Sequence, residues 1–238
     1  MPSPSRQTRT ALITGANRGI GFETAKQLAA QGWQVLATAR KAPFPSEHRL
    51  ALLALNPHTE FLTLDITQID SIENVVTQLH QSERKLDLLI NNAGILIDQN
   101  ESILTVDPVK LQNTFTTNTI APILLTRALV PFLEQSSAPL VLNLSSAAGS
   151  LTDMRHWAPA YSLSKAALNA ATRQLAIALA PKNISVCSVS PGWVRTDMGG
   201  PNATRSTEDA AKSIITLLNH SPKQLTARFL RDGTDLPW

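Results

Sequence analysis

The sequence predicts an α/β protein, with a doubly wound parallel sheet in a single domain. Short runs rich in Val, Ile and Leu alternate with longer amphipathic segments along the 238 residues. The runs are continuously apolar instead of alternating with polar residues, which is typical of parallel strands covered by helices on both faces. The alternation of strand and helix predicts right-handed crossover connections, and the length suits one well-packed domain.

Seven strands are expected in this sheet, the last of them the weakest. They are Ala11–Thr14, Gln34–Ala39, Glu60–Leu64, Leu86–Asn91, Leu140–Leu144, Ile184–Val189 and Arg228–Leu230. Helices are expected near residues 20–31, 69–84, 108–134, 160–180 and 207–219. Residues 1–9 are expected to form a flexible tail before the domain of residues 10–238. Ligands of such folds bind beyond the carboxyl ends of the strands, so functional side chains are expected just after each strand.

The composition excludes several functional classes. The net charge is only +3 and the Lys and Arg residues are scattered, so a nucleic-acid surface is not expected. The five His residues show no metal-ligand spacing and the single cysteine, Cys187, stands in an apolar run, so we expect neither a metal nor a disulfide. No uninterrupted apolar stretch reaches membrane-spanning length and the N-terminus has no signal-peptide core, so we expect a cytoplasmic protein without membrane contact.

A glycine-rich turn, Thr14-Gly-Ala-Asn-Arg-Gly-Ile-Gly21, follows the first strand. Gly15 would permit the sharp turn, Gly19 would let the backbone approach a pyrophosphate, and Gly21 would allow close packing of helix on strand. The helix that begins here would offer amide donors and the positive end of its dipole. An ordinary glycine turn has a similar composition, but the position favours a dinucleotide site. Its predicted contacts are Gly15, Asn17, Arg18, Gly19, Ile20 and Gly21.

The end of the second strand predicts which dinucleotide binds. NAD enzymes usually place Asp or Glu there to bind the ribose hydroxyls, but this strand ends Ala39-Arg40-Lys41. Arg40 is suited to bind a 2′-phosphate through two hydrogen bonds, and Arg18 in the glycine turn is expected to point to the same region. The missing acid and the two cations favour NADP(H) over NAD, the alternative being two exposed surface arginines.

The next two strand ends add candidate contacts. Asp65 follows the third strand, where its carboxylate can accept the adenine amino group, cap the next helix, or do both. The fourth strand ends Asn91-Asn92-Ala93-Gly94, whose amides and small residues allow a cofactor to pass closely. By itself this segment would be interpreted as a turn.

A candidate catalytic pair lies further along the chain. The only tyrosine, Tyr161, precedes Lys165 by four residues, so the two share one face of a predicted helix. An upstream strand ends in Ser145-Ser146, and Asn118 lies midway along the long helix before that strand. A lone Tyr on a helix is usually a packing residue, but these neighbours favour a chemical role.

Five motifs together resemble the short-chain dehydrogenase/reductase family in order and spacing, over nearly the whole chain. They are Thr-Gly-Ala-Asn-Arg-Gly-Ile-Gly, Asn-Asn-Ala-Gly, Asn-Leu-Ser-Ser, Tyr-x-x-x-Lys and Pro-Gly-Trp-Val. Residues 191–202 and the ending 228–238 resemble the branch of C-factor-like proteins and Sniffer-type carbonyl reductases. The resemblance implies a Rossmann-type three-layer sandwich.

The resemblance also implies residue roles. Tyr161 would be the catalytic acid/base, Lys165 its activator, Ser146 the hydroxyl that orients the carbonyl, and Asn118 the residue that holds a relay water. Further cofactor contacts would be Asp65, Ile66, Asn92, Ala93, Gly94, Tyr161, Lys165, Pro191, Gly192, Val194 and Thr196. A lysine ammonium at about 4.5 Å would favour the phenolate by roughly 3–4 kcal/mol, so the pKa of Tyr161 is expected to fall.

The expected function is NADPH-dependent reduction of an aldehyde, ketone or quinone. The candidate substrate pocket is mostly apolar, which predicts a hydrophobic small molecule. Its lining is Leu96, Met154, Trp157, Trp193 and Met198. The interval between Ser146 and Tyr161 is slightly longer than the commonest family spacing, so residues 149–159 are expected to form an active-site rim, and residues 195–206 a lid.

Two alternatives stay open at this point. One is a cofactor-binding regulatory protein with little turnover, and the other is a sugar-nucleotide epimerase, whose extra C-terminal domain is absent here. By analogy with the family, the helices at 108–134 and 160–180 are expected to form the faces of a homodimer or homotetramer.

Overall fold

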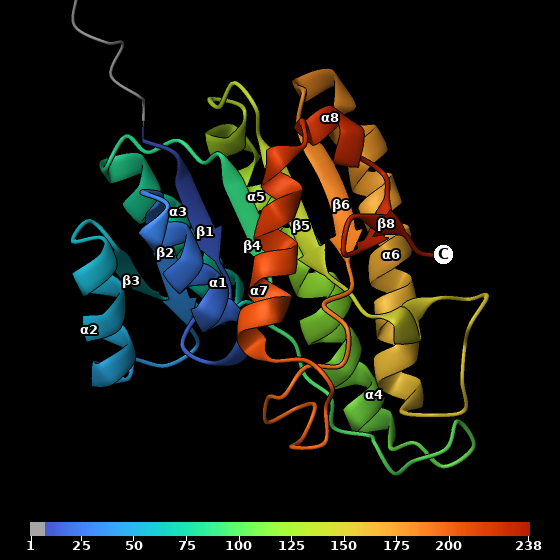
Figure 1. Ribbon diagram of the computed structural model, residues 1–238. Helices are drawn as coiled ribbons and strands as arrows, with labels where there is room; N and C mark the ends of the chain where they lie inside the picture. The colour runs from blue at the N-terminus through green and yellow to red at the C-terminus, as the bar shows by residue number, and fades with distance from the viewer. Residues whose placement is uncertain (1–7) are drawn as a thin grey trace, which may run out of the picture.

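One sheet runs through the whole protein (Figure 1). The computed structural model describes residues 8–238. The strands hydrogen-bond in the order β3-β2-β1-β4-β5-β6-β7-β8, and every neighbouring pair is parallel except β7 and β8. Their bounds are β1 Thr10–Ile13, β2 Gln34–Ala39, β3 Glu60–Thr63, β4 Leu88–Asn91, β5 Leu140–Leu144, β6 Ser185–Val189, β7 Phe229–Arg231 and β8 Thr234–Asp235. The predicted doubly wound sheet is confirmed, and its order reverses between β1 and β4, where such folds bind ligands.

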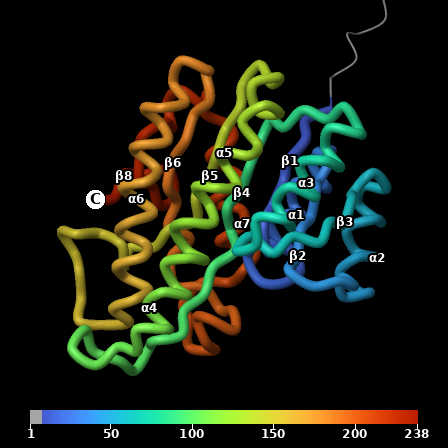
Figure 2. Tube along the Cα trace, turned by 180° about the vertical axis from the view of Figure 1, so that it is seen from behind, coloured from blue at the N-terminus to red at the C-terminus, as the bar shows by residue number. Residues whose placement is uncertain are grey.

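Helices cover both faces of the sheet, as Figure 1 and the reverse view in Figure 2 show. One face carries α1 (Gly19–Ala30), α2 (Ser46–Leu55), α7 (Thr207–Thr216) and α8 (Pro222–Leu225). The other carries α3 (Ile69–Gln81), α5 (Ala121–Leu133) and α6 (Pro159–Leu179), with α4 (Pro108–Phe115) packed on α6. Leu12 and Ile13 are adjacent in β1 and both fully buried, yet they belong to separate apolar clusters. Burial on both faces therefore accounts for the continuously apolar strand sequences.

The structure differs from the prediction in four places. α2, α8 and β8 were not predicted. In α2 the only buried residue is Leu52, while Leu50 and Leu55 are exposed, so its sequence has little of the amphipathic pattern that marks a packed helix. β8 has two exposed residues, too few for a recognisable pattern. The predicted single helix at 108–134 is interrupted by a π-helical turn at Thr116–Ile120.

A chain of buried polar side chains crosses the middle of the sheet. Asn91 and Asn143 are register partners on β4 and β5, and Asn143 pairs in turn with Ser188 on β6. Asn91 donates to the Asn143 side-chain oxygen at 2.8 Å, and Asn143 donates to Thr172 of α6 at 2.9 Å. The hydroxyls of Thr172 and Ser188 lie 2.8 Å apart. These bonds join three central strands to α6 just below the strand ends.

The last described residue is tied to the segment that follows β5. The backbone carbonyl of Trp238 accepts a hydrogen bond from the Leu151 amide at 2.9 Å. The centre of the Trp238 ring lies 5.7 Å from the centre of the Phe229 ring. The start of the 149–159 segment is thereby held against β7.

Within residues 8–238 no helix is both long enough and apolar enough to cross a membrane, and no group of three or more metal-ligating side chains is found.

Candidate active site

A cavity of about 750 Å³ opens beyond the carboxyl ends of the parallel strands. It is lined by the glycine turn, by the residues after β2, β3 and β4, by the first turns of α6 and by the segment after β6. Of the predicted cofactor contacts, the cavity wall contains Gly15, Asn17, Arg18, Gly19, Ile20, Gly21, Arg40, Asp65, Ile66, Asn92, Ala93, Gly94, Tyr161, Lys165, Pro191 and Thr196. Gly192 and Val194 do not line it. Val194 is buried and forms a bridge with Arg205.

The glycine turn forms a floor that a ligand can approach closely. Gly15 has a φ of +64°, a conformation that side chains disfavour. A Cβ on Gly21 would come within 2.4 Å of the Gly15 oxygen and of Nδ2 of Asn92, so no larger residue fits there. Thr14 ties this turn to the end of β4, because its hydroxyl accepts the amides of Asn92 and Ala93 at 2.9 Å each.

The N-terminus of α1 faces the same cavity without a side-chain cap. Arg18 occupies the cap position, makes no capping hydrogen bond, and no acidic residue follows in the first turn. The first helical residues, Gly19, Ile20 and Gly21, all line the cavity. Uncapped amides at the positive end of a helix dipole bind anions. This end of the cavity therefore fits the pyrophosphate of a dinucleotide.

The two predicted phosphate-binding arginines are placed differently. Arg40 is exposed at the cavity wall, next to Lys41. Arg18 instead forms an ion pair with Asp197, in the segment after β6. Arg18 and Arg40 line the same cavity, and their joint binding of a 2′-phosphate stays a prediction. Both side chains of the ion pair are largely exposed, so it contributes little stability and a competing anion can displace it.

Asp65 lines the cavity and does not cap α3. Its Oδ1 accepts hydrogen bonds from the Thr67 amide at 3.0 Å and the Thr67 hydroxyl at 2.7 Å. α3 begins at Ile69, with Gln68 at the cap position. The helix-cap alternative for Asp65 is therefore wrong.

The structure brings Tyr161, Lys165 and Ser146 together. Both helix residues are buried and line the cavity, and Ser146 hydrogen-bonds to Tyr161. The neighbouring Ser145 lines the cavity, whereas Ser146 does not, and the Ser145 hydroxyl donates to the Lys165 carbonyl at 3.4 Å. The hydrogen bond to Tyr161 is therefore what distinguishes Ser146 from Ser145.

Burial dominates the ionisation of this pair. Burial raises the pKa of Tyr161, and the hydrogen bond with Ser146 opposes this to a smaller extent. Burial also lowers the pKa of Lys165 to about 8. The Lys165 Nζ donates to the Leu144 carbonyl at 2.7 Å and lies 5.7 Å from the centre of the Tyr161 ring. The expected fall in the pKa of Tyr161 is therefore not found, because burial raises this pKa and the opposing contribution comes from Ser146.

Asn118 lies in the π-helical turn between α4 and α5, and its side chain is fully buried. Its Oδ1 accepts from the Ile95 amide at 2.8 Å, while its Nδ2 donates to the Ile95 carbonyl and to the Ser164 hydroxyl. The amide therefore joins the segment after β4 to α6, and it does not line the cavity. Single π-helical turns inside helices are frequent at functional sites.

A residue that the sequence analysis missed holds the start of α6. Asp98 is buried, and its Oδ2 accepts the backbone amides of Ala160 at 2.6 Å and Tyr161 at 3.4 Å. The local cap residue, Ala158, has no side chain for this purpose. Asp98 therefore acts as a cap from sixty-odd residues away. No pattern local to Tyr161 could have predicted this contact.

The predicted substrate pocket and lid are only partly assembled. Met198 lines the large cavity, whereas Met154 and Trp157 line a separate, mostly apolar cavity of about 230 Å³. The Trp157 ring still lies 6.1 Å from the Tyr161 ring. Trp193 donates to the Gly199 carbonyl within the 195–206 segment, and Leu96 lines neither cavity. Gln99 donates to the Met198 carbonyl at 3.2 Å, which joins the predicted lid to the segment after β4.

Comparison with known proteins agrees with this arrangement. The family model described as short chain dehydrogenase matches residues 9–207. C-signal of Myxococcus xanthus is 36% identical over 155 residues, which are 64% of this chain and 93% of that protein. The NADPH-bound carbonyl reductase from chicken fatty liver superposes with a TM-score of 0.89 at 32% identity, over 97% of this chain and 99% of that one. Carbonyl reductase Sniffer of D. melanogaster superposes with a TM-score of 0.88 at 30% identity, over 98% and 100%.

The matched region contains the glycine turn, Asn118, Ser146, Tyr161 and Lys165. The resemblance to C-factor-like and Sniffer-type proteins that the motifs predicted is confirmed by these relatives. The fold, the order of the motifs and the match over most of the chain agree, and the chain belongs to the short-chain dehydrogenase family.

Proposed function

We propose that this protein is an NADPH-dependent carbonyl reductase that acts on an aldehyde, ketone or quinone with an apolar body. The observation that carries the proposal is the meeting of Tyr161, Ser146 and Lys165 beside a cavity whose other end is an uncapped helix N-terminus. The uncapped helix N-terminus fits a phosphate-bearing dinucleotide. The group of Tyr161, Ser146 and Lys165 fits proton transfer to an oxygen. The basic end of β2, with Arg40 and no carboxylate, supports the 2′-phosphorylated form.

In the proposed reaction, NADPH would supply the hydride to the carbonyl carbon. The carbonyl oxygen then gains negative charge, and the Tyr161 phenol donates its proton to it. Ser146 donates a second hydrogen bond to the same oxygen. Burial raises the pKa of Tyr161, so the phenol stays protonated at neutral pH, as an acid in the reductive direction must. Lys165 places its ammonium beside the phenol to stabilise the phenolate that is left.

The likeness to C-signal keeps a regulatory protein with little turnover as the second candidate function. The buried Tyr161 and Lys165 favour the enzyme, because burying a lysine is costly and a regulatory protein would have no use for it. The experiment is NADPH oxidation measured across a panel of aldehydes, ketones and quinones. Turnover that Tyr161→Phe abolishes supports the reductase. Tight NADPH binding without turnover of any panel member would favour the regulatory function.

The cofactor preference has its own test. NADPH should bind more tightly than NADH, and Arg40→Asp should reverse much of that preference, because Arg40 stands where NAD enzymes place an acid. Equal dissociation constants of NADH and NADPH for the unmutated protein would contradict the assignment.

We also propose that the protein forms a homodimer or homotetramer through α4, α5 and α6. The support is a set of exposed large apolar side chains on α4, on α6 and on the π-helical turn that leads into α5, namely Val109, Leu163, Ile177 and Ile120. Light scattering on the purified protein tests this, and a monomeric mass at micromolar concentration would contradict it. The cytoplasmic location stays a prediction from the sequence.

A further inference from the structure

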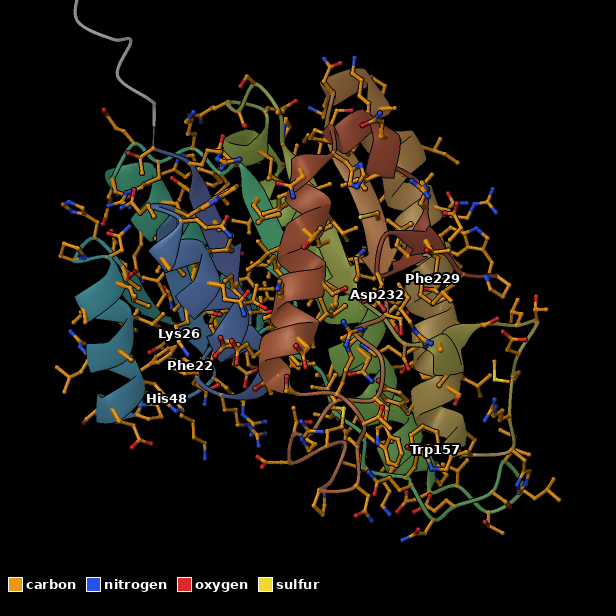
Figure 3. All side chains as sticks on the ribbon, in the orientation of Figure 1. Phe22, Lys26, His48, Trp157, Phe229 and Asp232 are labelled. Carbon is orange, nitrogen blue, oxygen red and sulfur yellow. The ribbon has the colours of Figure 1, made fainter. Side chains whose placement is uncertain are left out.

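α2, one of the two helices that the sequence did not predict, brings a histidine to the cavity. Figure 3 shows the His48 side chain of α2 next to Phe22 of α1. The two rings stack with centres 3.9 Å apart and an interplanar angle of 22°. The His48 Nδ1 lies 2.9 Å from the Asn17 carbonyl oxygen, in the glycine turn. His48 lines the same cavity as Arg40 and Lys41.

These contacts determine the role of each ring nitrogen. A backbone carbonyl only accepts hydrogen bonds, so Nδ1 of His48 must carry a proton and donate it to Asn17. Phe22 covers one face of the ring and fixes its plane. Nε2 is therefore the nitrogen that can contact a ligand. The His48 side chain is 29% exposed to solvent. A carboxylate oxygen of Glu47 lies 3.9 Å from Nε2, but that side chain is 84% exposed and holds it weakly.

The surrounding charge indicates what this nitrogen would bind. Arg40 and Lys41 follow β2 at the same wall of the cavity, and neither takes part in an ion pair among residues 8–238. Three carboxylates line the same cavity, and each has a partner: Glu23 is paired with Lys26 at 3.1 Å, Asp65 accepts two hydrogen bonds from Thr67, and Asp197 is paired with Arg18. Two unpaired cations and an oriented imidazole form a site for a compact anion with several oxygens.

We propose that His48 is a specificity residue that contacts the 2′-phosphate of the bound nucleotide together with Arg40. This rests on the proposed NADPH function, and it adds a contact from α2 to those from the glycine turn and β2. The Nε2 nitrogen hydrogen-bonds to a phosphate oxygen through one proton, which is supplied either by the doubly protonated imidazolium or by the phosphate monoester. Arg40 contributes a positive charge from the end of β2. A nucleotide without the 2′-phosphate leaves Nε2 in water and gains nothing from His48.

The test compares two small nucleotides that differ only in that group, 2′,5′-ADP and 5′-AMP, by calorimetric titration. His48→Phe keeps a ring to stack on Phe22, and His48→Asn keeps an amide donor for the Asn17 carbonyl. Both remove Nε2, so each should weaken 2′,5′-ADP binding about 5-fold while 5′-AMP binding changes less than about 2-fold. The matched control is His58→Phe, since His58 is exposed in the turn that follows α2.

The possible outcomes separate this inference from the cofactor assignment. If the unmutated protein prefers 2′,5′-ADP and Arg40→Ala removes the preference, but both His48 variants keep it, then only the role of His48 is overturned. An equal loss for both nucleotides in the His48 variants would also overturn it, as this would indicate a packing role. If the unmutated protein itself shows no preference, the NADPH assignment fails and this inference fails with it.

A measurement on the unmutated protein avoids any effect of the variants on folding. The nitrogen resonance of His48 Nε2 should shift on addition of 2′,5′-ADP and stay in place on addition of 5′-AMP. A shift of the same size with both nucleotides would overturn the proposed phosphate contact.

Discussion

Replacing Lys165 with Met should make the protein more stable at neutral pH while it removes activity. Burial lowers the pKa of Lys165 from 10.5 to about 8. Each unit of such a shift corresponds to about 1.4 kcal/mol, so the buried ammonium destabilises the fold by about 3 kcal/mol below pH 8. The substitution also leaves the Leu144 carbonyl without its 2.7 Å donor, which costs about 1–2 kcal/mol. The expected net gain in the free energy of unfolding at pH 7 is therefore about 1–2 kcal/mol.

The sharper part of this prediction is its pH dependence. Above about pH 8 the folded protein loses the Lys165 proton, whereas the unfolded chain keeps it up to 10.5, so the unfolded state binds more protons in this window. The unmutated protein should therefore gain about 2 kcal/mol between about pH 7 and 9.5, relative to Lys165→Met. The contributions of other titratable groups to the pH dependence cancel in this difference, because both proteins contain them. One such group is Cys187, since burial raises its pKa to about 12.

Urea denaturation of both proteins at a series of pH values measures this difference. Lys223→Met is the matched control, because Lys223 is exposed and should give a difference that does not vary with pH. If the difference between the unmutated protein and Lys165→Met is also flat from pH 7 to 9.5, Lys165 is not desolvated as the structure indicates.

Three further predictions concern the site. Tyr161→Phe removes only a hydroxyl, so turnover should fall roughly 100-fold or more while NADPH titration gives an unchanged dissociation constant; an active variant would exclude Tyr161 as the acid. Asp98→Ala removes the cap of α6 and should cost about 1–2 kcal/mol in urea denaturation and lower kcat, whereas Asp98→Asn keeps an acceptor and should recover most of both; equal losses in the two variants would refute the capping role. Amide hydrogen exchange across residues 195–206 should slow on saturation with NADPH, because the segment is expected to close over the cofactor; unchanged exchange would refute a lid.

How far the sequence predicts this protein depends on whether each signal is local. The strands were predictable because burial on both faces leaves a continuous apolar run. The glycine turn was predictable because the positions of its glycines mark where the backbone turns and where it packs closely. α2 escaped prediction because it buries only Leu52. The cap by Asp98 and the ion pair of Arg18 with Asp197 join segments far apart in the chain, and no local pattern marks such contacts.

Ionisation was the least predictable property of the site. The four-residue spacing of Tyr161 and Lys165 correctly placed both on one face of α6, but the spacing carries no information on solvent access. An attraction between the two groups can be expected from their spacing, whereas the desolvation of each depends on the fold around them. In the structure desolvation is the larger effect for both.

The polar chain through Asn91, Asn143 and Ser188 has a consequence for how the site keeps its shape. Sliding β4 by one residue along β5 would turn the Asn91 side chain to the other face of the sheet, where its amide would lie among apolar side chains such as Leu142 and Leu144. Each polar group left unpaired there would cost about 1–3 kcal/mol. The strands are therefore locked at a single alignment, and the segments that leave them, Asn92–Gly94 and Ser145–Ser146, emerge level with one another. Buried amides that do not line the cavity thus fix the strand register, and through it the positions of the reacting groups.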